Sequence, residues 1–210
     1  MSPYKIQYDT QKYQFRQVVE SMLEDLNLEK LHEVQQYDLF EVAKEAKTMW
    51  HPKYYSKFKD EFYSLYAKFI EKVIKPHFGF ETLVYQKIPT LRIHLHQNVG
   101  VGGWHKDRDY NHTQGEINCW LPFTDTFNTN TIWMESEEGK GDYQPYDVKY
   151  GELLIFDGVN LLHGNKTNEE NQTRVSVDFR VVDINNFNPS EKTSFQNPTK
   201  FEIGDYFEKI

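Results

Sequence analysis

Hydrophobic positions in the first third of the chain recur at the three- and four-residue spacing of an amphipathic helix. One such segment runs from Phe15 to Leu26, a second from Leu39 to Met49, and a third from Phe58 to Ile74. The third segment precedes Pro76, which lacks a backbone N–H and is expected to stop the helix. Because a helix with one apolar face must bury that face, we expect all three segments to pack on another layer.

From about residue 81 onward the hydrophobic repeat changes from a helical period to a period of two. Short β-type runs cover residues 82–88, 91–97, 116–123, 131–136, 152–158 and 174–182, with Gly, Asn, Asp and Pro between them. Helices followed by many short strands indicate an α+β protein with antiparallel sheets and helices on one side. We expect one domain over residues 1–210, with helical support in 1–80, a sheet core in 81–182 and a covering segment in 183–210.

Three of the predicted strands carry unusual polar rows. Side chains alternate between the two faces of a strand, so each row lies on one face. The apolar rows consist of aliphatic side chains, Cys119 and Phe179. The polar rows are Arg92, His94 and His96; Glu116, Asn118 and Trp120; and Arg174, Ser176, Asp178 and Arg180.

Two arrangements account for these rows. The polar faces could be solvated, as in an ordinary one-sided antiparallel sheet. Alternatively, the strands form a jelly roll, or double-stranded β-helix, in which helices cover the apolar faces and the polar faces line a central pocket. Arg, His, Asn, Ser and Trp favour the second arrangement, because these residues orient ligands and metals while surface strands favour Thr, Lys and Glu.

Composition and charge exclude several other classes of protein. The 210 residues are 38% hydrophobic and 16% aromatic, which indicates a folded globular chain. A net charge of −8 argues against a nucleic-acid interface and leaves a small-molecule partner. No apolar run approaches the roughly 18 residues of a membrane span, and the single cysteine, Cys119, suits the cytoplasm, where we expect the protein.

Candidate metal ligands lie in the Gly-rich segment after the second strand run. His105 and Asp107 are two residues apart, so in extended chain both side chains point the same way and Lys106 points the opposite way. His163 follows the apolar run 152–156 and precedes a Gly-Asn turn. Two imidazoles and one carboxylate form the facial triad that binds Fe(II) and leaves positions open for substrate and dioxygen.

A basic motif completes the pattern, because Arg174-Val175-Ser176 begins eleven positions after His163. With H-x-D and the distal His, this motif resembles the Fe(II)- and 2-oxoglutarate-dependent dioxygenases. Within that superfamily the sequence over about 91–182 is similar to the streptomycin-biosynthesis-type oxygenases, and more distantly to phytanoyl-CoA-hydroxylase-like enzymes. The block "GEINCWLPFTDTFNTNT", residues 115–131, contributes to this narrower resemblance.

The resemblance implies a double-stranded β-helix (cupin-like) core, Fe(II), 2-oxoglutarate and dioxygen. His105, Asp107 and His163 would bind the metal, and Arg174 would hold the distal carboxylate of 2-oxoglutarate with help from Ser176. Arginine suits that role because its guanidinium binds a carboxylate through two parallel hydrogen bonds. The implied activity is hydroxylation of a polar small molecule with release of succinate and CO2. Related halogenases lack the carboxylate ligand, so Asp107 favours hydroxylation or another oxidative outcome.

Other side chains are candidates for binding the two organic substrates. Asn118 is expected to contact the cosubstrate or a water on the metal. Arg180 lies on the same face as Arg174 and is an alternative carboxylate anchor. Arg92 could equally form a structural ion pair with Asp178, and the aromatic candidates could equally be core residues. The candidate substrate-binding residues are Arg92, His94, Trp104 and Tyr110.

Two rival functions remain open at this point. One is a cupin-type metal enzyme without 2-oxoglutarate, in which His94, His96 and another residue would bind the metal, although the downstream Glu of that pattern is missing from residues 97–103. The other is a non-catalytic jelly-roll module that binds a carbohydrate or a partner. That module would need neither a tight iron site nor Arg174.

Overall fold

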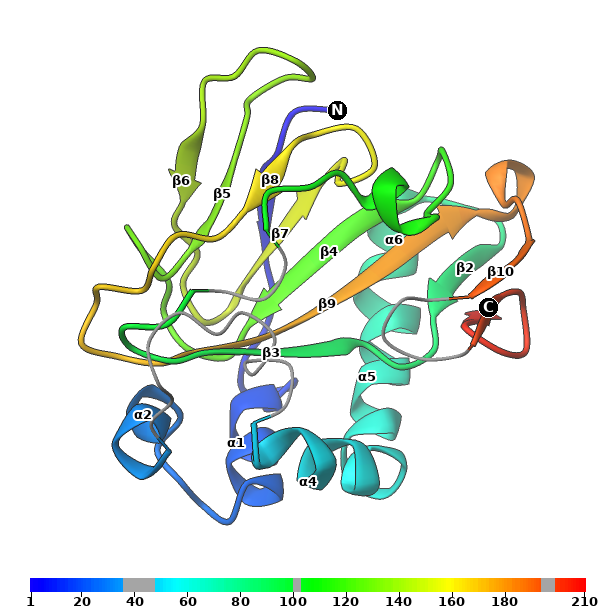
Figure 1. The fold of residues 1–210 in the computed structure, drawn as a ribbon. Helices are drawn as coiled ribbons and strands as arrows, with labels where there is room; N and C mark the ends of the chain where they lie inside the picture. Colours follow the sequence, from blue (N-terminus) through cyan, green and yellow to red (C-terminus); the bar gives the residue numbers. More distant parts are fainter. Residues whose placement is uncertain (36–47, 100–102, 194–198) are drawn as a thin grey trace.

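A computed structural model describes residues 1–35, 48–99, 103–193 and 199–210. The predicted helix from Leu39 to Met49 lies almost entirely outside the described residues. None of the helices within those ranges is both long and apolar enough to span a membrane. Figure 1 shows helices gathered against one face of a large twisted sheet, with a smaller group of strands on the other face.

The helical layer contains two of the three predicted segments. Near the N-terminus it holds α1 (Phe15–Met22), the 3₁₀ turn η1 (Leu28–Lys30) and α2 (Leu31–Val34). A continuous helical column then runs from residue 50 to residue 78. It comprises α4 (Trp50–Lys57), the π turn η2 (Phe58–Phe62), α5 (Tyr63–Phe69), the π turn η3 (Ile70–Ile74) and α6 (Lys75–Phe78).

The expectation that Pro76 stops the third helix is wrong. The column continues to Phe78 and ends at Gly79, whose φ of 68° is the left-handed conformation typical of a helix C-terminus. In a regular α-helix the proline ring would clash with the carbonyl group four residues earlier. Here the wider π turn Ile70–Ile74 directly precedes the segment that contains Pro76, so the helix is not regular at that point.

The main sheet contains seven antiparallel strands in the order β1-β7-β4-β9-β2-β12, and β3 also pairs with β9. Its strands are β1 (Tyr4–Gln7), β2 (Leu83–Gln86), β3 (Thr90–His94), β4 (Ile117–Pro122), β7 (Glu152–Phe156), β9 (Arg174–Asp183) and β12 (Phe207–Lys209). The ten-residue strand β9 is central, because β4 lies along one edge while β2 and β3 lie along the other. All six predicted strand runs are present as strands.

A second, three-stranded sheet has the order β6-β5-β8, and its strand β5 packs on side chains of β4 and β7 in the main sheet. It consists of β5 (Ile132–Met134), β6 (Gln144–Tyr146) and β8 (His163–Gly164), and an isolated bridge joins His105 to His163. The remaining short elements are η4 (Asp107–Tyr110), η5 (Ile184–Asn186), β10 (Ser190–Thr193) and β11 (Lys200–Phe201).

Both ends of the chain contribute strands that periodicity does not predict. β1 pairs with β7 at one end of the main sheet, and β12 pairs with β2 at the other. The segment after residue 183 therefore extends the sheet, and it also forms a small core around Phe201, Tyr206 and Phe207. Three or four residues are too few for a period of two to stand out from the polar sequence around them.

Burial distinguishes the two arrangements of the polar rows. The helices and the apolar rows of β3, β4, β7 and β9 form one continuous core. The opposite face is also buried: Asn118, Arg174, Ser176, Asp178 and Arg180 are each at most 8% exposed. The solvated arrangement is therefore wrong, and the polar rows face inward, toward the second sheet.

Candidate metal and cosubstrate site

Three predicted ligands converge at the junction of the two sheets. One potential ligand atom each from His105, Asp107 and His163 lies within 4.8 Å of the others. The Nε2 atoms of both histidines lie 3.5 Å from Oδ1 of Asp107. The bridge between residues 105 and 163 fixes the two histidine backbones, and Asp107 opens the 3₁₀ turn η4 directly behind them. Asp107 and His163 are buried, while His105 is partly exposed.

The other ring nitrogen of each histidine determines the tautomer. Nδ1 of His105 lies 2.7 Å from the Gly103 carbonyl oxygen, and Nδ1 of His163 lies 2.9 Å from the Leu161 carbonyl oxygen. A carbonyl oxygen only accepts, so each Nδ1 carries the proton and donates. In the neutral rings, both Nε2 lone pairs therefore face Asp107, which is the orientation that a shared metal ion requires.

The second carboxylate oxygen of Asp107, Oδ2, is fixed by hydrogen bonds on the side away from the histidines. Oδ2 accepts hydrogen bonds from Nδ2 of Asn118 at 2.7 Å and from Nη2 of Arg180 at 2.9 Å. Burial raises the pKa of Asp107, but the positive charge of Arg180 outweighs it and holds the pKa well below its usual value. Asp107 is therefore ionised, with Oδ1 directed at the histidines and Oδ2 fixed.

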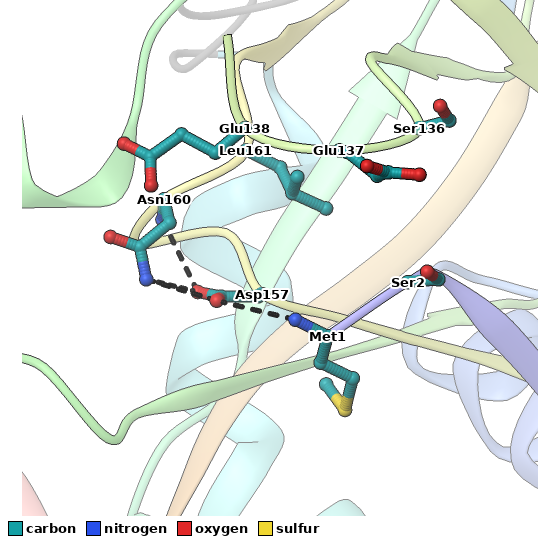
Figure 2. A pocket seen from close by; sticks show the side chains of 8 residues that line it. All are labelled: Met1, Ser2, Ser136, Glu137, Glu138, Asp157, Asn160 and Leu161. Atoms are coloured by element: carbon teal, nitrogen blue, oxygen red, sulfur yellow. Dashed lines mark hydrogen bonds and ion pairs between the residues drawn. The ribbon is translucent and has the colours of Figure 1, made fainter. Parts of the chain in front are cut away.

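The turn between β7 and His163 brings the backbone close to the triad. The carbonyl oxygen of Gly158 accepts from the Asp107 backbone N–H at 2.8 Å. A Cβ at position 158 would lie 2.5 Å from Nδ2 of Asn118, so only glycine fits there without displacing that side chain. Figure 2 shows the far side of this turn, where Asp157 accepts from the Asn160 side chain beside an acidic hollow that also contains Glu137 and Glu138.

A hollow of about 480 Å³, including its open mouth, lies in front of the triad. It is lined by both predicted histidine ligands and by most of the polar-row side chains of β4 and β9, without Glu116 and Ser176. It also contains apolar side chains from the smaller sheet and from the end of β7, which makes one wall polar and the other apolar. Its lining residues are Arg92, His105, Asn118, Trp120, Ile132, Phe156, His163, Gly164, Asn165, Arg174, Asp178 and Arg180.

Arg174 lies on the wall of this hollow formed by β9, and Ser176 is buried two residues further along the same face of that strand. Arg174 is 3% exposed and its Nη1 donates to the Asn130 carbonyl oxygen at 3.0 Å and to Oδ1 of Asn165 at 2.7 Å. Its guanidinium carbon lies 5.5 Å from the centre of the Trp120 ring. Nε1 of Trp120 donates to Oγ of Ser176 at 3.1 Å. The predicted cosubstrate anchor is thus a buried cation, braced by an amide and an aromatic ring.

Asn118, Arg180 and Arg92 are all placed in the hollow, with partners among the ionic side chains. Asn118 is bonded to the carboxylate of Asp107, and Arg180 is bonded to Asp107 and to Asp178 at 2.6 Å, so it is not a spare anchor. Nε of Arg92 donates to Oδ1 of Asp178 at 2.7 Å. Arg92 therefore forms the predicted ion pair with Asp178. Its side chain also lines the hollow, so a contact with substrate stays possible for it.

The other candidate substrate residues do not line the hollow. His94 is fully buried and bonded to the Asn98 carbonyl oxygen. Trp104 is 40% exposed, packs edge-on against Tyr143 and lies over Gly164. Tyr110 contacts the ring of His105 edge-on, at 4.9 Å between centroids, and so braces a predicted ligand.

The surroundings of the H-x-D motif agree with the expected alternation. Lys106 points away from the triad and its Nζ lies 3.2 Å from Glu138. Asp109 accepts the Lys106 backbone N–H and so closes the turn that begins at Asp107. His112 is bonded to the buried Glu116 and packs on Phe201, away from the triad.

The rival metal site of the cupin type lacks a convergent set of ligands. Nε2 of His94 lies 2.8 Å from the Asn98 carbonyl oxygen, and Nδ1 of His96 lies 2.8 Å from the Glu170 carbonyl oxygen. Strand β3 ends at His94, so the alternation that would place both rings on one face does not continue to residue 96. Over the described ranges, the triad at 105, 107 and 163 is the single such group.

The site has lining residues that the sequence patterns do not identify. Ile132 and Phe156 provide the apolar wall, and Asn165 holds Arg174. Ile132 and Phe156 look like ordinary core positions, because their strands have no polar row. Asn165 follows the H-G pair directly, and its distance of nine residues from Arg174 is the only signal that could have linked the two.

Burial of His94 leads to a prediction about acid stability. Burial, and then the charge of Arg174, lowers the pKa of His94 to about 3. In the unfolded chain its pKa is about 6.5, so unfolding takes up a proton between these values. The neutral ring therefore stabilises the fold above pH 6.5, and this contribution is lost progressively as the pH falls toward 3. Between pH 6.5 and 5 this loss should lower the free energy of unfolding by about 2 kcal/mol.

The measurement is urea unfolding of wild type and His94→Gln at several pH values between 7 and 5. The wild-type free energy of unfolding should fall more steeply with decreasing pH than that of the variant. Equal slopes in the two proteins would show that His94 is not held neutral by burial.

Comparison with known proteins supports this description of the fold and the sequence resemblance. No family model matches the chain. Among solved structures, the non-heme α-ketoglutarate-dependent carbocyclase SnoK from nogalamycin biosynthesis covers 100% of this chain and 92% of its own, with a TM-score of 0.64 and 9% identity. EctD from S. alaskensis with bound Fe covers 88% and 74%, with a TM-score of 0.52 and 13% identity. CytC3 with Fe(II) and α-ketoglutarate covers 91% of this chain and 78% of its own, with a TM-score of 0.51 and 15% identity.

The fold is therefore shared with these three solved structures, one of a non-heme α-ketoglutarate-dependent carbocyclase and two with bound iron. In sequence, the chain is similar to the streptomycin biosynthesis protein StrG of Streptomyces griseus, at 37% identity over 130 residues. The match spans 62% of this chain and 62% of the relative's length. Both comparisons confirm the resemblance predicted from H-x-D, the distal His and the R-x-S motif.

Proposed function

We propose that this protein is an Fe(II)- and 2-oxoglutarate-dependent oxygenase that hydroxylates a polar small molecule. The observation that carries the proposal is the convergence of two Nε2 atoms and one carboxylate oxygen on a common point, next to a hollow with a buried arginine. We further propose that residues 1–210 act as one oxygenase domain and that its two facing sheets correspond to a double-stranded β-helix.

The donor set fits ferrous iron. Imidazole and carboxylate are suitable ligands for Fe(II), and a 2-His-1-carboxylate set leaves open positions. His105, Asp107 and His163 would hold the ion, and Asn118 and Arg180 would fix the carboxylate. When bound with 2-oxoglutarate, the metal supplies oxidation by dioxygen, which converts a substrate C–H to C–OH and 2-oxoglutarate to succinate and CO2.

The remaining tasks fall to the protein's own side chains. Arg174 would hold the distal carboxylate of 2-oxoglutarate, and the Ser176 hydroxyl, which accepts from Trp120, keeps its own proton to donate to the same group. Ile132 and Phe156 make the opposite wall apolar and so exclude water from that side. Polar groups on the β4 and β9 wall support a polar substrate.

Replacement of Arg174 should separate cosubstrate binding from metal binding. Arg174→Gln is expected to raise the KM for 2-oxoglutarate by about ten- to a hundredfold, because it removes a charge-assisted hydrogen-bond pair. The assay is Fe(II)-dependent release of succinate, with Fe(II) affinity measured alongside. Fe(II) affinity in the absence of 2-oxoglutarate should be unchanged. Arg174→Lys should raise the KM for 2-oxoglutarate less, since lysine keeps the positive charge but lacks the two parallel N–H donors of the guanidinium.

An unchanged KM in folded Arg174→Gln would remove Arg174 from the cosubstrate site. The absence of any Fe(II)-dependent succinate from the wild type, with and without candidate substrates, would contradict the proposed function. A non-catalytic binding module predicts that absence.

A further inference from the structure

An alternating chain of charged side chains runs across the inner face of the main sheet. Arg92 is bonded to Oδ1 of Asp178 at 2.7 Å, and Arg180 to Oδ2 of the same carboxylate at 2.6 Å. Arg180 is bonded in turn to Asp107. Both oxygens of Asp178 are therefore occupied. This series of ion pairs ends at Asp107, the proposed metal ligand, on one side and at Arg92 on the other. Arg92 is thus a fixed group.

Arg92 engages this chain through Nε. Within the described residues, its two terminal nitrogens have no hydrogen-bond partner, and its side chain is 23% exposed and lines the hollow. With Nε held by Asp178, the outer edge formed by Nη1 and Nη2 remains for a ligand. That edge offers two parallel N–H donors, which is the geometry that binds one carboxylate through both of its oxygens.

The register of the sheet places Arg92 away from the cosubstrate anchor. Arg92 pairs with Ser176, so it lies one strand to the side of β9 and about 7 Å along it from Arg174. Arg180, which marks the triad end, lies about 13 Å further along β9 from Ser176. Arg174 is nearly inaccessible while Arg92 is partly exposed. A molecule that enters after 2-oxoglutarate would therefore meet Arg92 first.

Charges in the hollow leave one positive charge to be balanced. Three arginines and Asp178 line it, and Asp107 lies at its base, so these side chains carry one net positive charge. Fe(II) and dianionic 2-oxoglutarate would cancel each other. One excess positive charge favours a substrate with a single negative charge near Arg92.

We propose that Arg92 is the substrate anchor and that the substrate is a small organic acid whose carboxylate binds the outer edge of this guanidinium. The inference rests on the proposed function, because it assumes that Arg174 is taken by 2-oxoglutarate. Asp178 and Arg180 act as positioning residues that set the direction of Arg92. The substrate carbon to be oxidised then lies between this anchor and the triad.

The test uses acetate as the carboxylate probe and acetamide as its neutral partner. Protein loaded anaerobically with Fe(II) and 2-oxoglutarate has a weak visible charge-transfer band, and binding of either probe is followed by perturbation of this band and of the arginine side-chain NMR signals. Wild type should bind acetate at least about tenfold more tightly than acetamide. Arg92→Gln should lose this preference and keep the band itself, and Arg92→Lys should keep part of the preference. The control is Lys166→Gln, which removes an exposed cation outside the hollow and should behave as wild type.

The possible outcomes separate the two proposals. No band in folded wild type would contradict the proposed function. A normal band with no preference for acetate in the wild type, or the same preference in Arg92→Gln, would overturn the anchor while leaving the oxygenase intact. Loss of the band in Arg92→Gln, with a thermal melt like that of wild type, would also overturn it, because Arg92 would then serve the cosubstrate.

Discussion

Replacing Asp107 by asparagine is expected to weaken Fe(II) binding by at least about a hundredfold. Changes to groups that merely orient a metal ligand cost ten- to a hundredfold, and this change neutralises a proposed ligand itself. The loss should be large because the carboxylate is ionised and because its second oxygen is held by Asn118 and Arg180, which leaves Oδ1 for the metal. The measurement is an anaerobic Fe(II) titration by calorimetry.

The matched control is Asp109→Asn, which changes a carboxylate two residues away. Asp109 is exposed and closes the turn by accepting a backbone N–H, a bond that the asparagine side-chain oxygen can also accept. Its Fe(II) affinity should equal that of wild type. An equal loss in both variants would mean that the H-x-D spacing does not select the ligand.

Removal of Arg180 is expected to lower the free energy of unfolding of the metal-free protein by about 3–5 kcal/mol. That range is typical for the loss of one partner from a buried ion pair, because the opposite charge stays buried without compensation. In the wild type, Arg180 contacts two buried carboxylates, Asp107 and Asp178, each at less than 3 Å. Arg180→Met leaves both carboxylates without this partner. Urea unfolding at pH 7 measures the effect.

Arg108→Met provides the control for this loss of charge. Arg108 pairs with Glu138 at 2.9 Å, but both side chains are more than 40% exposed, so the replacement should cost less than about 1 kcal/mol. Added Fe(II) should restore part of the stability of Arg180→Met, since the cation would neutralise Asp107. Equal losses in the two variants would show that the buried chain of charges does not stabilise the fold.

The sequence predicts the central part of this fold well. The alternation over 174–182 predicts strand β9 and also which side chains share its inner face, because a period of two is physically fixed in a strand. The helix after Phe58 is found from its apolar spacing. Its true start at Trp50 and its continuation through Pro76 are missed, since π turns change the local geometry in a way that no single residue signals.

The candidate site is predicted more completely for the metal than for its surroundings. The convergence of His105, Asp107 and His163 is predicted from the sequence, because H-x-D and a distal His are the pattern of a 2-His-1-carboxylate ligand set. The role of Arg180 is missed, since the same row offers two arginines and only the structure places one of them on Asp107. His94 looks equivalent to Arg92 by alternation, yet the chain turns after β3 and buries it against Asn98.

The most direct measurement is an anaerobic titration of the wild type with Fe(II) and then 2-oxoglutarate, followed by visible absorption. The proposed function predicts one Fe(II) and one 2-oxoglutarate per chain and a weak charge-transfer band that is absent in His163→Ala. A folded, iron-loaded wild type that gives no band at saturating 2-oxoglutarate, or a band of equal strength in His163→Ala, would contradict it.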